Sequence, residues 1–229
     1  MTRHHPRPRP LAALLALGLV VAATALVWAR AGAGPDRCVE RAERAEQRSE
    51  LVTGTGPEVL VIGDSYSVGA GVQPDQSWPV RLPGRVRVDG FSGSGFSAGA
   101  SGCGDLSYAT RAPRSLRTTT RLVVVEGGLN DTDQPVADLE GGARRLLRLL
   151  DGRRVLVVGP PATPDRSWGE VARVDAALQR LAGEYGASYL SMLDADLTYQ
   201  DDDLHPDPAG HRVFGDIVAA QVEAMLTSS

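Results

Sequence analysis

A serine in the first third of the chain and a histidine near its end are the residues best suited to nucleophilic chemistry. Ser65 directly follows an apolar run at residues 59–62 and the dipeptide Gly63-Asp64. A serine hydroxyl is a weak nucleophile at neutral pH and needs a base within reach. His205 could be that base, because imidazole changes its charge near neutral pH. Taken alone, Ser65 is more simply explained as a turn serine or a helix cap.

Consecutive aspartates precede this histidine, and each could orient its ring. They are Asp201, Asp202 and Asp203. A carboxylate that accepts the Nδ1 proton fixes the imidazole tautomer and leaves Nε2 free to take a proton from Ser65. Composition does not choose among the three aspartates. The segment by itself also fits a solvated acidic loop with an incidental histidine.

Two more segments could stabilise negative charge on a reacting oxygen. Asn130, which can donate an amide N–H, follows an apolar run at residues 122–125 and a pair of glycines. A glycine-rich segment at residues 90–104 follows the apolar residues 86–88, and glycine permits close backbone approach to a ligand. Acyl transfer needs such donors aimed at the developing oxyanion. The simpler explanations are an Asn-Asp turn and an ordinary glycine-rich loop.

The elements that must position these residues alternate short apolar runs with amphipathic stretches. The pattern predicts helices at about residues 136–150, 169–185 and 208–226, and strands at residues 59–62, 86–88, 122–125, 155–158 and 188–190. This alternation is typical of βα units around a parallel sheet. Ligands bind at the carboxyl ends of the strands in such sheets. We therefore expect Ser65 and Asn130 at that edge, with His205 on the loop that follows the last strand.

In order along the chain, these segments resemble the motif blocks of the SGNH hydrolase (GDSL esterase/lipase) superfamily over roughly residues 57–226. Gly63-Asp64-Ser65 is similar to the nucleophile block, although Tyr66 stands where many members have leucine. Asp202-Asp203-Leu204-His205 matches the Asp-x-x-His block. This spacing selects Asp202 as the orienting carboxylate.

The other two blocks of the resemblance concern the oxyanion. Gly128-Leu129-Asn130-Asp131 matches the Gly-x-Asn-Asp block. Gly93 and Gly95 both fit the glycine block, and the offset from Asp89 favours Gly93. The resemblance thus implies an oxyanion hole made by the backbone N–H groups of Ser65 and Gly93 and by the Asn130 side chain.

The resemblance also implies a fold and an activity. The fold is a three-layer α/β/α arrangement with a five-stranded flavodoxin-like parallel sheet. The activity is hydrolysis of carboxylic esters of short acyl groups, sugars or lipids by a triad of Ser65, His205 and Asp202, with no metal and no cofactor. Two alternatives are a carbohydrate O-acyltransferase, in which a sugar hydroxyl replaces water, and a non-catalytic binding domain on the same fold.

The N-terminal residues 1–33 have the layout of an export signal. Basic residues precede an apolar run at residues 11–28, and small residues follow it. The run is longer than most signal-peptide cores and barely long enough to span a bilayer. It predicts either a cleaved signal peptide or a retained membrane anchor, with the rest of the chain outside the cytoplasm in both cases. A helical stalk and linker are expected at residues 34–56, before a hydrolase domain at residues 57–229.

Charge and cysteine content restrict the partners. The chain has 24 basic and 28 acidic residues, and an acidic body is poorly suited to neutralising the phosphates of nucleic acids. A small-molecule, glycan or lipid ester is the expected partner, whereas the oligomeric state is not predicted. The only cysteines, Cys38 and Cys103, would form a disulfide in an oxidising compartment or remain free thiols.

Overall fold

The computed structural model describes residues 36–228. The predicted signal or anchor at residues 1–33 therefore lies outside the described residues. Two compact units make up the chain, residues 1–40 and residues 41–229. Residues 36–40 of the first unit are helical, and the second unit begins with helical residues 41–50. The second unit contains all the candidate catalytic residues, and it starts upstream of the expected hydrolase domain.

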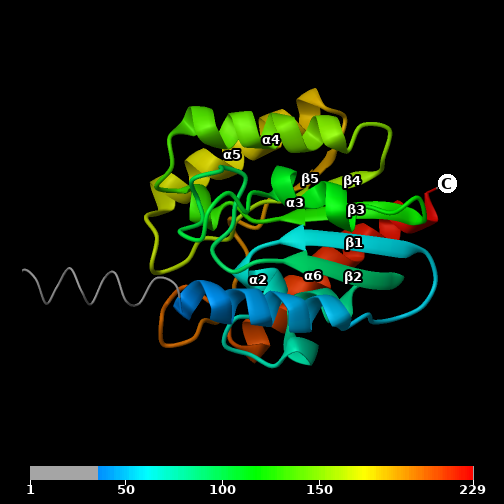
Figure 1. The fold of residues 1–229 in the computed structure, drawn as a ribbon, viewed down its shortest axis with the longest axis horizontal. Coiled ribbons are helices and arrows are strands. Elements are labelled where there is room, and N and C mark those ends of the chain that lie inside the picture. Colours follow the sequence, from blue (N-terminus) through cyan, green and yellow to red (C-terminus); the bar gives the residue numbers. More distant parts are fainter. Residues whose placement is uncertain (1–35, 229) are drawn as a thin grey trace, which may run out of the picture. The chain divides into compact units, whose positions relative to one another are not determined.

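A parallel sheet forms the centre of the second unit (Figure 1). Its strands are β1 (Glu58–Gly63), β2 (Arg85–Gly90), β3 (Thr120–Glu126), β4 (Val155–Val158) and β5 (Ser188–Leu190). The five strands lie in the order β2-β1-β3-β4-β5, and every neighbouring pair is parallel. The predicted α/β fold is confirmed. The order of connection changes direction between β1 and β3, which is where ligands bind in flavodoxin-like sheets.

Helices cover both faces of this sheet, as Figure 1 shows. The three predicted helices are present as α4 (Val136–Leu149), α5 (Trp168–Glu184) and α6 (Pro208–Thr227). The sequence did not reveal α3 (Tyr108–Ser115), which is short, mostly polar and contains Pro113, or the single-turn α2 (Ser65–Val68). Two short 3-10 helices, η1 (Pro74–Gln76) and η2 (Trp78–Arg81), follow α2, and η3 (Leu129–Asp131) follows β3.

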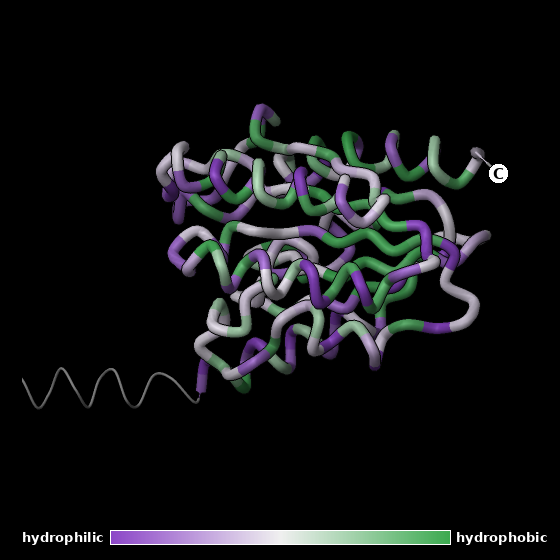
Figure 2. The backbone as a smooth tube through the Cα atoms, turned by 90° about the horizontal axis from the view of Figure 1, so that it is seen from above, coloured by the Kyte–Doolittle hydropathy of each residue, from purple (hydrophilic) through white to green (hydrophobic). Residues whose placement is uncertain are grey.

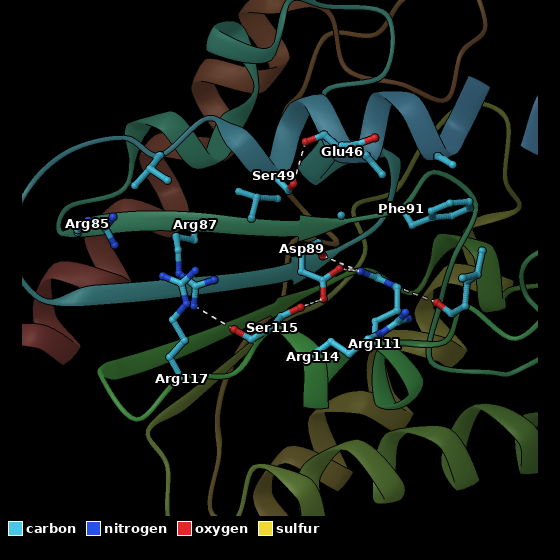
Figure 3. Close-up of a pocket in the computed structure, with 16 residues that line it drawn as sticks. Glu46, Ser49, Arg85, Arg87, Asp89, Phe91, Arg111, Arg114, Ser115 and Arg117 are labelled. Atoms are coloured by element: carbon cyan, nitrogen blue, oxygen red, sulfur yellow. Dashed lines mark hydrogen bonds and ion pairs between the residues drawn. The ribbon is translucent and has the colours of Figure 1, made fainter. Parts of the chain in front are cut away.

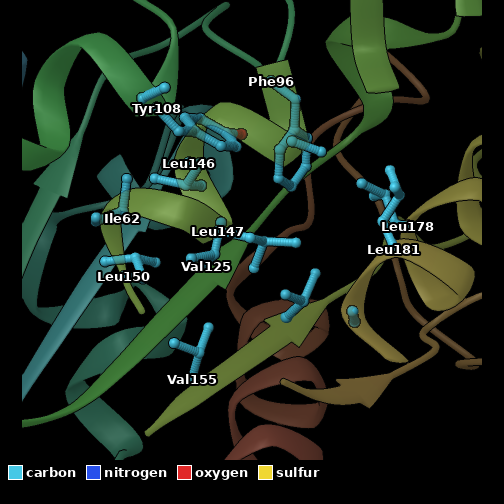
Figure 4. Close-up of a cluster of buried hydrophobic side chains, with 14 of the residues drawn as sticks. Ile62, Phe96, Tyr108, Val125, Leu146, Leu147, Leu150, Val155, Leu178 and Leu181 are labelled. Carbon is cyan, nitrogen blue, oxygen red and sulfur yellow. The ribbon is translucent and has the colours of Figure 1, made fainter. Parts of the chain in front are cut away.

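The apolar core has one layer on each face of the sheet. Leu60 and Ile62 of β1 pack with α3, α4 and α5 (Figure 4), whereas Val59 and Val61 pack with α6. Successive strand side chains point to opposite faces, so a strand covered on both faces is apolar throughout. Figure 2 shows the hydrophobic residues concentrated along the central strands. This core fixes the strand ends that carry the candidate site.

Both cysteines are accounted for in the covalent structure. Cys38 and Cys103 are disulfide-bonded, and no free thiol occurs among the described residues. Disulfides are typical of proteins in oxidising compartments.

Within residues 36–228, no helix combines the length and the apolar character that crossing a bilayer requires.

Candidate active site

Ser65 lies at the carboxyl end of β1 as the first residue of α2. The preceding Asp64 caps this helix, because its carboxylate accepts a hydrogen bond from the backbone N–H of Tyr66 at 3.0 Å. Gly69 ends the helix in a left-handed conformation. This tight turn places the Ser65 hydroxyl at the tip of the strand.

His205 and Asp202 reach Ser65 from the loop between β5 and α6. His205 Nε2 lies 3.0 Å from Ser65 Oγ, and His205 Nδ1 lies 2.6 Å from Asp202 Oδ2. The fold thus brings together a hydroxyl and an imidazole that are 140 positions apart. In this order of contacts, the imidazole can take the hydroxyl proton while the carboxylate fixes the ring.

The Asp202 carboxylate is held by hydrogen bonds from its own loop. Its Oδ1 accepts from the backbone N–H groups of Leu204 at 3.0 Å and His205 at 2.9 Å. Partial burial tends to raise the pKa of Asp202, but the hydrogen bonds from His205 and Leu204 outweigh it and lower the pKa to about 2. Asp202 is therefore charged at neutral pH and can stabilise a protonated His205.

Tyr66 links the serine turn to the histidine loop, a contact that the sequence did not reveal. Its hydroxyl donates to the backbone carbonyl of Leu204 at 2.6 Å, and its side chain is almost fully buried. The Tyr66 and His205 rings are 6.3 Å apart between centroids. The departure from the family leucine at this position therefore supplies a hydrogen bond that leucine cannot make.

Asn130 lies between the serine turn and the glycine-rich segment. Its Nδ2 is 2.9 Å from the carbonyl oxygen of Ser94 and 3.1 Å from Asp64 Oδ2. Both amide protons thus have acceptors within the protein, and an oxyanion would have to replace one of them. Gly93 lies one residue before Ser94 with φ +84. Two of the three predicted oxyanion donors, Asn130 and Gly93, are therefore carried by adjoining loops.

The neighbouring Asp131 fixes the glycine-rich segment. Its carboxylate oxygens accept hydrogen bonds from the backbone N–H of Phe96 at 3.0 Å and of Ser97 at 2.7 Å. The Asp131 side chain is buried, and burial raises its pKa although these hydrogen bonds oppose the shift. Sequence analysis placed Asp131 in a motif but gave it no role. Its structural role is to anchor the segment that carries Gly93.

Asp64 and Glu126 carry buried carboxyl groups next to the turn that contains Ser65. Ser67 Oγ donates to Glu126 Oε2 at 2.6 Å. Burial raises the pKa of Asp64 to about 6 and that of Glu126 well above its usual value. The sequence signal for Glu126 was an acidic residue at the end of an apolar strand.

Among residues 36–228, no cluster of three or more histidine, cysteine or acidic side chains could hold a metal ion.

A cavity of about 370 Å³ adjoins Asn130. Its lining is mostly polar and comprises Ala100, Leu129, Asn130, Thr132, Asp133, Asp165, Arg166 and Glu170. Aromatic residues do not line this cavity. Trp78 and Phe96 are instead fully buried in the core, and Trp168 is exposed. The cavity beside Asn130 is therefore lined mainly by polar and charged groups.

Comparison with known proteins identifies the family. The GDSL-like lipase/acylhydrolase family model matches residues 61–213. The fold is similar to a carbohydrate acetylesterase family member from Sinorhizobium meliloti, with a TM-score of 0.62 and 21% identity over 74% of this chain and 98% of that one. It is also similar to the native aryl esterase of M. smegmatis, with a TM-score of 0.60 and 21% identity over 74% of this chain and 99% of the esterase.

A putative arylesterase from Agrobacterium tumefaciens is similar to the same degree, with a TM-score of 0.60 and 22% identity over 73% of this chain and 98% of that one. Identities this low indicate a shared fold. No curated protein matches the sequence. Because the family model spans more than half of the chain, this protein belongs to the GDSL-like lipase/acylhydrolase family, whose structural relatives are SGNH-type esterases.

Proposed function

We propose that this protein is an exported serine esterase that hydrolyses carboxylic esters with Ser65, His205 and Asp202. The observation that carries the proposal is the unbroken contact chain of 3.0 Å from Ser65 Oγ to His205 Nε2 and 2.6 Å from His205 Nδ1 to Asp202. Ser65 Oγ attacks the ester carbonyl carbon while His205 removes the hydroxyl proton. Asp202, charged at neutral pH, stabilises the resulting imidazolium.

The negative charge that develops on the carbonyl oxygen is held by three donors in this proposal. They are the backbone N–H groups of Ser65 and Gly93 and the Asn130 amide, which would release Ser94 or Asp64. His205 then returns its proton to the leaving alcohol. Water, deprotonated by His205, then attacks the acyl-serine. The tetrahedral intermediate that forms collapses, takes the proton back from His205 to regenerate the Ser65 hydroxyl, and releases the carboxylic acid.

We further propose a compact polar ester as substrate. The cavity beside Asn130 offers Thr132, Asp133, Asp165 and Glu170, groups suited to hydrogen-bonding hydroxyls. A long acyl chain would cover these groups and remove the charged ones from water, which is costly. A sugar acetate fits this lining better than a lipid ester does. The fold of a carbohydrate acetylesterase family member is compatible with such a substrate.

Export rests on the N-terminal residues and on the disulfide state. Residues 1–33 have the basic, apolar and small-residue order of an export signal, an order typical of secreted and membrane-anchored proteins. The disulfide-bonded Cys38 and Cys103 support an oxidising location. Fractionation of cells that express the full chain tests this part, because recovery of the protein from the cytoplasm with reduced cysteines would contradict it.

The test of the chemistry is the Ser65→Ala variant of the full chain. We expect hydrolysis of nitrophenyl acetate to fall by about four orders of magnitude or more, since the nucleophile is removed. Circular dichroism and the melting temperature should be unchanged. A fluorophosphonate probe should label Ser65 in the unmodified protein, as read by peptide mass spectrometry. Undiminished turnover in the variant, or labelling of another serine, would refute the assignment.

A substrate series tests the proposed polar ester separately. Nitrophenyl esters of increasing chain length should be turned over less well beyond the acetyl group, and acetylated sugars should release acetate. A preference for long acyl chains would contradict the polar ester while leaving the serine mechanism intact. Product analysis with a sugar acceptor distinguishes hydrolysis from acyl transfer.

A further inference from the structure

A second cavity, of about 530 Å³, lies at the β2 edge of the sheet (Figure 3). Helical residues 41–50 form one wall, and β2 with α3 and the turn after it forms the other. None of the candidate catalytic residues lines it. Its volume falls within the range of small-molecule sites, roughly 300–1,000 Å³. It is therefore a separate candidate binding site.

Arginines dominate the sheet side of this cavity. On β2, Arg85 and Arg87 alternate with the buried Val86 and Val88, and both arginines line the cavity, as Val88 also does. The segment from α3 to the following turn adds Arg111, Arg114 and Arg117. Five guanidinium groups thus gather at one site of a protein whose formal net charge is -4.

The neighbouring carboxylates do not balance these arginines. Arg111 pairs with Asp89. Glu58 is the shared partner of the other paired arginines, at 2.9 Å from Arg87 and 3.4 Å from Arg85, and it lies 3.8 Å from Arg117. One carboxylate therefore faces three guanidinium groups.

The remaining charges leave the cavity positive. Within residues 36–228, Arg114 forms no ion pair and no side-chain hydrogen bond, and Glu46 is the only other acidic residue of the lining. The positive excess is about two elementary charges, which an anion of matching charge would neutralise.

The charged form of Glu58 is stabilised mainly by Arg87 and Thr120, and not by all three neighbouring arginines. Burial tends to raise its pKa, but hydrogen bonds from Arg87 and from Thr120 at 2.8 Å outweigh this and lower it. Arg85 and Arg117 are about half exposed, so their ion pairs with Glu58 contribute little to stability. Their guanidinium groups remain available to a ligand.

Unused donors and the opposite wall indicate the kind of anion. Arg87 Nε is buried and has no hydrogen-bond partner among the described residues. Planar guanidinium forks match the oxygens of phosphate. The facing wall contributes the small or apolar Ala42, Ala45 and Val52 beside Glu46 and Ser49, and its apolar part could accommodate an organic substituent.

We propose that this cavity binds the phosphate group of a phosphate ester, carried by either a soluble molecule or a lipid headgroup. The phosphate oxygens lie against Arg85, Arg87 and Arg114, and the organic part of the ester lies along the wall of residues 42–52. The site is distinct from the esterase centre and does not depend on its chemistry.

The test is titration calorimetry of the full chain with glycerol phosphate and with inorganic phosphate. The Arg85→Gln/Arg114→Gln variant should bind glycerol phosphate at least about tenfold more weakly, because two charge-assisted hydrogen-bond donors are removed from the phosphate. Arg121→Gln/Arg154→Gln is the matched control, because these arginines line a different cavity. It should bind within about twofold of the unmodified protein, since its phosphate site is intact.

Ser65→Ala provides a second control and should retain full affinity. Both double variants should have the melting temperature of the unmodified protein when no ligand is present, which would show that they fold. Loss of binding to phosphatidylglycerol vesicles in the Arg85/Arg114 variant alone would assign a lipid source, and phosphate binding without vesicle binding would assign a soluble one. Absence of saturable binding to either phosphate, or equal weakening in both double variants, would overturn the proposal.

Discussion

Two loops meet at Ser65, and they are held in different ways. The glycine loop, residues 91–107, is largely buried near Ser65 and is fixed by Asp131 from the loop after β3. The histidine loop, residues 191–207, is more exposed, and Asp202 hydrogen-bonds to backbone groups two and three residues further on. The glycine loop therefore depends on a distant carboxylate, whereas the carboxylate that contacts His205 is held by backbone groups of its own loop.

This difference explains which loop can be interpreted from sequence. Local hydrogen bonds impose a fixed spacing, and the Asp-x-x-His pattern records it. Distant contacts leave no such spacing. Gly95 approaches the Asp131 carboxylate so closely that a Cβ would lie 2.4 Å from Oδ2, while Gly93 has a positive φ. Both positions suit glycine for different reasons, and in the sequence only the offset from Asp89 favours Gly93.

Among changes to these two loops, the largest expected effect comes from neutralising Asp202 in the histidine loop. In Asp202→Asn, the amide keeps its size but loses the charge that fixes the His205 tautomer. We expect kcat for nitrophenyl acetate to fall by about 10²–10³-fold, less than the roughly 10⁴-fold loss in a protease with a buried aspartate, because the Asp202 side chain is half exposed. Steady-state kinetics measure this.

The adjacent aspartates are matched controls for this prediction. Asp201→Asn and Asp203→Asn should retain activity within about twofold, since surface substitutions away from special features usually change little. Asp203 has φ 56, a conformation that asparagine tolerates. Equal losses in all three variants would mean that general loop charge, and not the Asp202 contact, supports activity.

The glycine loop should instead be sensitive to the packing of α4 against its backbone. A Cβ at Gly142 would lie 2.0 Å from the backbone oxygen of Phe96. Gly142→Ala should therefore lower the free energy of unfolding by about 1–3 kcal/mol, as overpacking does. Gly141 has open space around its Cβ direction, so Gly141→Ala should raise stability by about 0.5–1 kcal/mol. Urea denaturation of Gly142→Ala and Gly141→Ala measures both free energies of unfolding. Equal changes in the two variants would contradict the close packing at Gly142.

A smaller effect is expected where the serine turn touches the histidine loop. Tyr66→Phe keeps the buried ring but removes the hydrogen bond to Leu204. The free energy of unfolding should fall by about 1 kcal/mol, the usual net value of one such bond. The kcat should fall by less than about tenfold, since His205 keeps its Asp202 contact. Unchanged kcat and stability would show that Tyr66 does not position this loop.

Much of the fold was predictable because strong local patterns carry it. The apolar strands and the helices α4, α5 and α6 were all expected. The helix α3 was missed because Pro113 interrupts its pattern and tertiary contacts hold it. At the site, Ser65 and His205 were nominated by type and position. The contacts of Tyr66 and Asp131 were not, because they join residues 138 and 34 positions apart and have no local signature.

The smallest predicted effect is the acid response of the histidine loop. The pKa of Asp202 is lowered from 3.8 to about 2 in the folded protein. The unfolded chain therefore binds the proton first as pH falls, so the stabilisation is complete above pH 3.8 and is lost toward pH 2. Because the carboxylate is half exposed, the change should not exceed about 1 kcal/mol. Urea denaturation at each pH should show that the stability difference between the unmodified protein and Asp202→Asn shrinks between pH 5 and pH 2. A constant difference for Asp202→Asn would show that the contacts of this carboxylate do not favour its charged form.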